Sequence, residues 1–122
     1  MGRMLLLILL LSPAAGAEED RRLDDCLEAS GGATHLVSSC LKEALERKER
    51  RLHRTLNQAL ERLPKSRRAE LERIQRLWLE YRDAYCGFLY HPRSGSGGLL
   101  DMQECLLEET RRRNRTIEET IP

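Results

Sequence analysis

The sequence predicts an all-α fold: a small three-helix antiparallel bundle tied by two disulfides. Three observations lead to this prediction. Apolar residues recur at intervals of three, four or seven along two long stretches, proline and glycine gather between such stretches, and four cysteines follow an apolar N-terminus. Low aromatic content and high charge also suit helices separated by turns.

The N-terminus has the features of a secretory signal peptide. Arg3 precedes an apolar run, residues 4–11, and Ala15-Gly16-Ala17 supplies the small residues that a signal peptidase reads. The run is shorter than the roughly 20 residues that a membrane-spanning helix needs. We therefore predict a signal peptide over residues 1–17, one domain over residues 18–122, no stable membrane anchor, and a place in the periplasm or outside the cell.

The charge of the exported chain argues against nucleic acid as a partner. Loss of Arg3 from the 21 basic residues leaves 20, which equals the number of acidic residues. A protein that binds duplex nucleic acid normally presents a basic face, because most of its affinity comes from phosphate contacts.

The first helix is predicted from Thr34, as its N-cap, to a stop at Pro64. One stripe along it is apolar and the other faces alternate acidic and basic residues, which is typical of a solvated surface. The stripe consists of Val37, Leu41, Leu45, Leu52, Leu56, Ala59 and Leu63.

The second helix is predicted to begin near Ser66, and its apolar spacing indicates a packing seam. A loop of turn-forming residues, 91–98, then precedes a third helix whose inner side runs from Leu100 to Ile117. The seam of the second helix consists of Leu71, Ile74, Trp78, Tyr81, Tyr85 and Phe88.

The four cysteines are predicted to form two disulfides, because an exported chain of this size gains from covalent constraint and the spacing does not suit zinc. The loop allows Cys86 to approach Cys105. One continuous helix would separate Cys26 from Cys40 by about 21 Å, but Gly31-Gly32 lets the chain fold back. Pairing Cys26 with Cys40 is therefore preferred over the two crossed arrangements, which stay open.

The order of these residues resembles the LprI-type domain, a family named after a lysozyme inhibitor. The likeness spans nearly the whole exported chain and rests on two motifs, W-x3-R-D-x2-C and C-x4-T-x2-R-x3-I, together with an earlier pair of cysteines. It implies an exported helical domain of bacteria and a role in inhibiting lysozyme or in another interaction at the cell envelope. The matching residues are Cys26, Thr34, Cys40, Trp78, Arg82, Asp83, Cys86, Cys105, Thr110, Arg113 and Ile117.

Function is therefore expected to be binding rather than catalysis, with no cofactor and no metal. The histidines lack metal spacing, and no catalytic signature surrounds a nucleophile. The expected partner is a protein, either a lysozyme-type glycosidase or, as the alternative, another envelope protein for which this chain is a structural or accessory module. The loop is the candidate contact, through His91, Arg93, Ser94 and Ser96.

Overall fold

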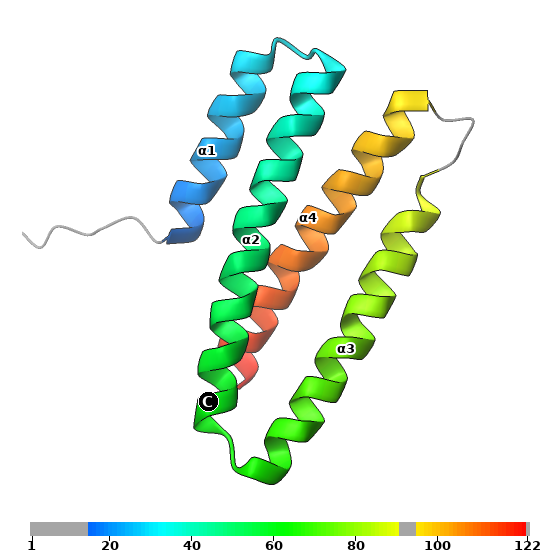
Figure 1. Ribbon diagram of the computed structural model, residues 1–122. Helices are drawn as coiled ribbons and strands as arrows, with labels where there is room; N and C mark the ends of the chain where they lie inside the picture. Colours follow the sequence, from blue (N-terminus) through cyan, green and yellow to red (C-terminus); the bar gives the residue numbers. More distant parts are fainter. Residues whose placement is uncertain (1–14, 91–94, 122) are drawn as a thin grey trace, which may run out of the picture.

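The computed structural model describes residues 15–90 and 95–121, which form four helices and no strand. The helices are α1 (Ala15–Ser30), α2 (Thr34–Arg62), α3 (Lys65–Phe88) and α4 (Gly95–Thr120) (Figure 1). The all-α class is confirmed, but the prediction of three helices is wrong, because the segment before Gly31 is also helical.

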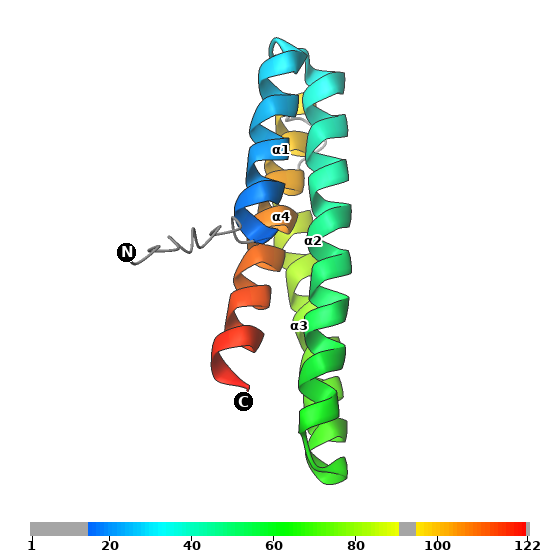
Figure 2. The same ribbon diagram turned by 90° about the vertical axis from the view of Figure 1, so that its left-hand side faces the viewer.

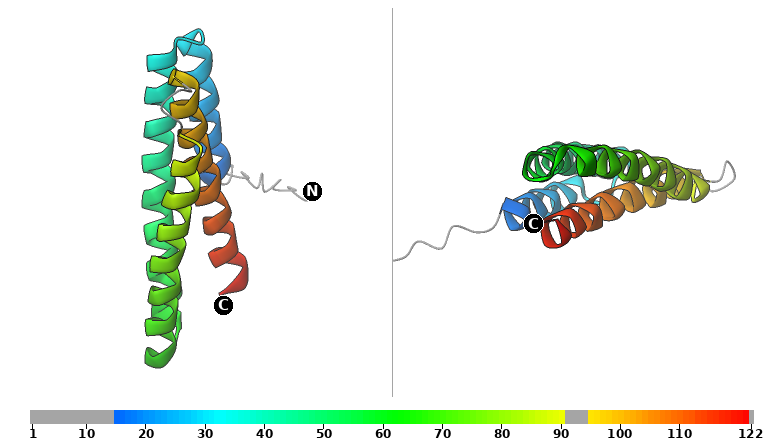
Figure 3. Two further views of the ribbon diagram at one scale, coloured as in Figure 1. Left: turned by 90° about the vertical axis from the view of Figure 1, so that its right-hand side faces the viewer. Right: turned by 90° about the horizontal axis from the view of Figure 1, so that it is seen from below.

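The helices lie in two layers. α2 and α3 form one layer and α1 and α4 the other, as the views from the side and from below show (Figures 2 and 3). α2 and α3 meet at a tight turn and then diverge, and α4 packs against both of them. The most extensive interface joins α2 and α4, which run in the same direction, whereas α1 lies antiparallel on α2.

α1 is helical because its few apolar residues fall on the side that meets α2. Leu23 is buried, and Cys26 and Leu27 pack beside it against α2. Gly31 and Gly32 then reverse the chain with φ of 58° and 80°, in the left-handed region that residues with a Cβ rarely adopt. A disulfide joins Cys26 to Cys40, whose Cα atoms lie 5.7 Å apart.

The core has two parts. The first joins α1, α2 and α4 through Leu23, Leu41, Ala44 and Leu107. The second joins α2, α3 and α4 through Leu52, Ala59, Leu71 and Ile117. α4 contributes Leu107 to the first part and Ile117 to the second, so it joins the part that contains α1 to the part that contains α3.

Three helix starts differ from the prediction. Thr34 is the first residue of α2 and not its N-cap, which is Ala33, and no side chain caps this helix. α4 begins at Gly95, so residues 95–98 are helical although they were predicted as loop. Small, flexible residues are tolerated there because the first amide groups of a helix need no partner within the helix. α3 begins at Lys65, one residue before the predicted start.

The predicted packing seam of α3 is largely wrong. Leu71 is buried and Trp78 half-buried, but Ile74, Tyr81 and Tyr85 are exposed, and Phe88 is 84% exposed. The buried residues of α3 are Leu71, Gln75, Arg82 and Cys86. α3 therefore turns a mixed polar face inward and leaves much of its apolar face uncovered.

Within residues 15–90 and 95–121, none of the helices combines the length and the apolar character that crossing a membrane requires.

A buried lysine fastens the start of α1 to α2. Lys48 Nζ lies 2.9 Å from Glu19 Oε2 and 3.2 Å from Asp20 Oδ1, and Asp20 also accepts a hydrogen bond from Arg111 Nη2 of α4 at 2.9 Å. Burial alone would raise the pKa of Asp20, but Lys48 and Arg111 outweigh it and hold the pKa below its ordinary value of 3.8.

The docking of α1 should therefore weaken in acid. Folding lowers the pKa of Asp20, so its ionised carboxylate stabilises the docked α1 fully above pH 3.8. This stabilisation is lost as the pH falls from 3.8 through the pKa of Asp20 in the folded protein. Hydrogen exchange of the α1 amides between pH 5 and about pH 2.5, corrected for intrinsic exchange, should show this loss of protection. Asp20→Asn should flatten the profile in this window, and an unchanged profile would rule out this role for Asp20.

Candidate functional site

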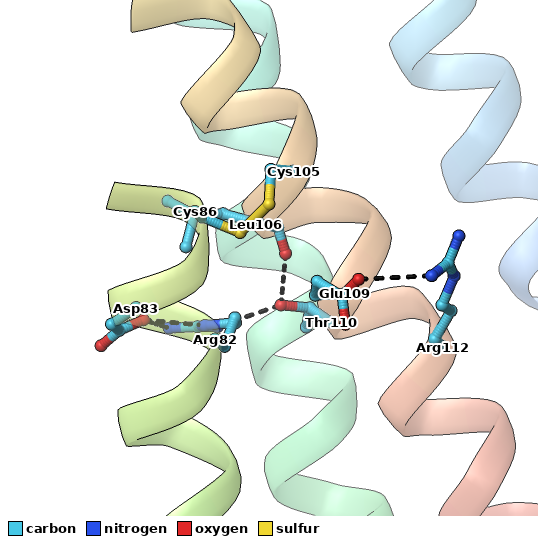
Figure 4. The surroundings of a disulfide bond; sticks show 8 residues. All are labelled: Arg82, Asp83, Cys86, Cys105, Leu106, Glu109, Thr110 and Arg112. Atoms are coloured by element: carbon cyan, nitrogen blue, oxygen red, sulfur yellow. Dashed lines mark hydrogen bonds and ion pairs between the residues drawn. A yellow bond between two sulfur atoms is a disulfide. The ribbon is translucent and has the colours of Figure 1, made fainter. Parts of the chain in front are cut away.

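The two motifs meet at one place, where the middle of α3 faces α4. Arg82 projects from α3 and is 6% exposed, and its Nη1 donates to Thr110 Oγ1 on α4 at 3.0 Å (Figure 4). The Thr110 hydroxyl in turn donates to the carbonyl of Leu106 at 2.7 Å. A charged group is therefore buried at this helix–helix contact with its hydrogen bonds satisfied.

Two carboxylates compensate the charge of Arg82. Nε donates to Asp83 Oδ1 at 2.9 Å, and Nη1 donates to Glu49 Oε1 of α2 at 3.0 Å. Both carboxylates reach solvent, so little free energy is spent on removing them from water. Through these contacts and the one to Thr110, the guanidinium group of Arg82 links α2, α3 and α4.

Two guanidinium groups lie over the ring of Trp78. The Cζ atoms of Arg82 and Arg113 are 5.3 and 5.7 Å from the centre of its ring, within the range of a cation–π contact. Arg113 Nε also donates to Gln75 Oε1 at 3.0 Å, and burial lowers the pKa of Arg113. Trp78 also packs against the part of the core that contains Ile117.

The second disulfide lies one turn along from Arg82. Cys86 and Cys105 have Cα atoms 5.5 Å apart, and Cys86 is fully buried (Figure 4). Both disulfides thus have the pairing preferred from the sequence, and no cysteine is free. Trp78, Arg82 and Cys86 lie on the inner face of α3, together with Leu71 and Gln75. This face packs within the domain, so it is not available to a partner.

The remaining predicted site residues fall elsewhere. Thr34 is exposed at the first residue of α2, apart from this cluster. His91, Arg93 and Ser94 lie outside the described residues, and Ser96 lies in the first turn of α4. Their predicted role in binding stays a prediction.

Sequence reasoning missed Glu49 and Gln75, which complete the cluster. Glu49 belongs to the charged run Glu46–Arg54, where nothing distinguishes it from its neighbours. Gln75 carries a weak signal, since it lies one heptad before Arg82 and thus on the same side of the helix.

A different surface of α3 is available for binding. We call it the outer face of α3: Ile74, Leu77, Tyr81, Ala84, Tyr85 and Phe88, all of which are exposed. The rings of Tyr81 and Tyr85 stack with their centres 5.7 Å apart. Exposed apolar residues scattered singly are ordinary, but a row of them along one helix is typical of an interaction surface.

At Ile74, the end of the outer face nearest the start of α3, the outer face meets a cleft between α3 and α4. The cleft has a volume of about 310 Å³ and is lined mainly by apolar side chains, including Leu71, Ile74, Ile117 and Ile121. Arg67 and Glu70 of α3 and Arg113 of α4 also line it. Across the described ranges, no group of three or more histidine, cysteine or acidic side chains is placed to hold a metal ion.

Comparison with known proteins identifies a family that matches most of the chain. A family model described as "Lysozyme inhibitor LprI" matches residues 26–116, which include both disulfides, Trp78 and the Arg82–Thr110 contact. Comparisons with curated proteins and with solved structures gave no significant match. Since the family model covers most of the sequence, the chain belongs to the LprI family of lysozyme inhibitors.

Proposed function

We propose that this protein is exported and inhibits a lysozyme-type glycosidase by binding to it, without catalysing a reaction itself. The observation that carries the proposal is the family match over residues 26–116. That range contains every cysteine and the inner face of α3, and so the parts that give the domain its shape.

Two features of the chain support export to the periplasm or beyond. The predicted signal peptide, residues 1–17, directs the chain across a membrane. The two disulfides suit an oxidising compartment, because thiols in the cytosol are kept reduced.

Inhibition by this fold would be steric. The helices present a rigid surface whose conformation is set by two disulfides, so little ordering is needed when a partner binds. An inhibitor of this kind acts stoichiometrically and reversibly, whereas an enzyme that modified the glycosidase would act at substoichiometric amounts.

Titration of lytic activity tests the proposal. The oxidised protein, secreted so that its signal peptide is removed, is added to a basic c-type lysozyme acting on peptidoglycan. We expect activity to fall in proportion to added protein and to reach its minimum near one-to-one, and we expect the protein to lose this effect after reduction and alkylation of its disulfides.

Unchanged lysis at a large molar excess would exclude this glycosidase as the target. An accessory role toward another envelope protein would then be the better hypothesis, and the protein recovered with this chain from the envelope would be the partner to identify.

A further inference from the structure

We propose that the outer face of α3 is the interface of a homodimer, in which α3 of a second copy lies antiparallel along it. This inference goes beyond the proposed inhibition of a glycosidase and does not depend on it. It starts from what α3 exposes and from what that pattern of residues fits.

The spacing on the outer face is that of a helix–helix seam. Ile74, Leu77, Tyr81, Ala84 and Phe88 follow one another at intervals of three, four, three and four residues. Apolar residues repeating every 3.5 residues keep one line of a helix in contact with a neighbouring helix. In the part of the chain that the structure describes, no helix occupies this line, since all these residues are exposed. The expected occupant is therefore another helix.

The size and composition of this face suit a specific contact. From Ile74 to Phe88 it extends for about 21 Å along the helix axis. Its exposed fractions are high: Leu77 is 52% exposed, and the stacked Tyr81 and Tyr85 lie at its centre. Tyrosine and other aromatic side chains contribute most at the centres of protein interfaces, because they bury a large area with few rotatable bonds.

An antiparallel pair is self-complementary in shape. We place Leu77 of one copy opposite Tyr81 of the other. Phe88 is seven positions after Tyr81 and Glu70 is seven positions before Leu77, so in an antiparallel pair Phe88 lies opposite Glu70. Glu70 and Ile74 line the 310 Å³ cleft between α3 and α4. The most exposed aromatic side chain of one copy therefore lies beside the apolar cleft of the other, and the two-fold axis repeats this contact.

The charges along α3 favour the same orientation. Residues 65–76 contain five basic and two acidic side chains, whereas residues 77–88 contain two acidic and one basic. Antiparallel pairing places the basic half of each α3 beside the acidic half of its partner, and parallel pairing would place like charges together.

Sedimentation velocity of the oxidised protein over a range of concentrations tests the proposal. We expect the mass to rise to twice that of one chain as the concentration increases. Leu77→Glu and Tyr81→Glu should keep the protein monomeric at every concentration, because each places a carboxylate in an apolar seam. Leu36→Glu is the matched control: Leu36 is also exposed, but it lies on α2, so this variant should form dimers like the wild type.

Hydrogen exchange provides a measurement that needs no substitution. Amides of α3 over residues 74–88 should become better protected at high concentration than at low concentration, while those of α1 should not change. A monomer at all concentrations would overturn the proposal, and so would a dimer that Leu77→Glu leaves intact. Loss of lysozyme inhibition in Leu77→Glu, with the wild type monomeric, would assign the outer face to the glycosidase and would equally overturn it.

Discussion

Replacing Arg82 with alanine should lower the free energy of unfolding by about 3 kcal/mol. The substitution removes the hydrogen bonds to Thr110 and Glu49 and the pairing with Asp83, and it leaves a void beside Trp78. The loss falls at the lower end of the range for a broken buried ion pair, because both carboxylates reach solvent and can be hydrated again. Urea unfolding followed by circular dichroism measures this difference.

Two further variants separate charge from volume at this position. Arg82→Met keeps most of the side-chain volume and removes the charge. It should lower the free energy of unfolding by only about 1 kcal/mol, because a buried charge can often be replaced by an apolar side chain of similar size. Arg76→Ala, on the exposed side of the same helix, should change stability by less than about 0.5 kcal/mol. Equal losses for Arg82→Ala and Arg76→Ala would show that the buried contacts of Arg82 do not stabilise the fold.

Arg82 also shows why the inner face of α3 could not be predicted from hydrophobicity. Two rows of residues lie along α3 at similar spacing: the outer face, and the inner row Leu71, Gln75, Trp78, Arg82 and Cys86. The outer row is the more apolar, so periodicity alone favours burying it. The inner row is buried because Cys86 is bonded to Cys105, and because Arg82 finds Thr110 and Glu49 on two other helices.

α1 was missed for a related reason. Its sequence, AGAEEDRRLDDCLEAS, has few large apolar residues, and half of its residues are charged. The helix is held by Leu23, Cys26 and Leu27 on one side and by ion pairs from Glu19 and Asp20 to Lys48. Lys48 lies in the charged run of α2, and only tertiary structure distinguishes it from its neighbours. By contrast, the apolar stripe of α2, the stop at Pro64 and the preferred pairing of the cysteines could be predicted, because apolar periodicity, proline and loop length are local signals.

Removing the Cys86–Cys105 disulfide should also lower the free energy of unfolding by about 3 kcal/mol. The two cysteines are 19 residues apart, and without the bond the unfolded chain gains the entropy that closing this loop had removed. The variant is Cys86→Ala with Cys105→Ala, because alanine places no hydroxyl in the fully buried position of Cys86. The matched control is Cys26→Ala with Cys40→Ala, which opens a loop of similar size, with positions 14 residues apart, so the urea midpoints of the two variants should fall by similar amounts.

Hydrogen exchange should distinguish the two variants although their stabilities are similar. α3 packs chiefly on α4, and its outer face is exposed in the part of the chain that the structure describes, so without its disulfide the last turns of α3 should lose protection first. In the control variant, α1 should lose protection while residues 79–88 of α3 keep theirs, because Arg82 still connects α3 to α4 and α2. An equal loss of protection in all four helices of both variants would show instead that the domain opens as one cooperative unit, with neither disulfide stabilising one pair of helices more than the other.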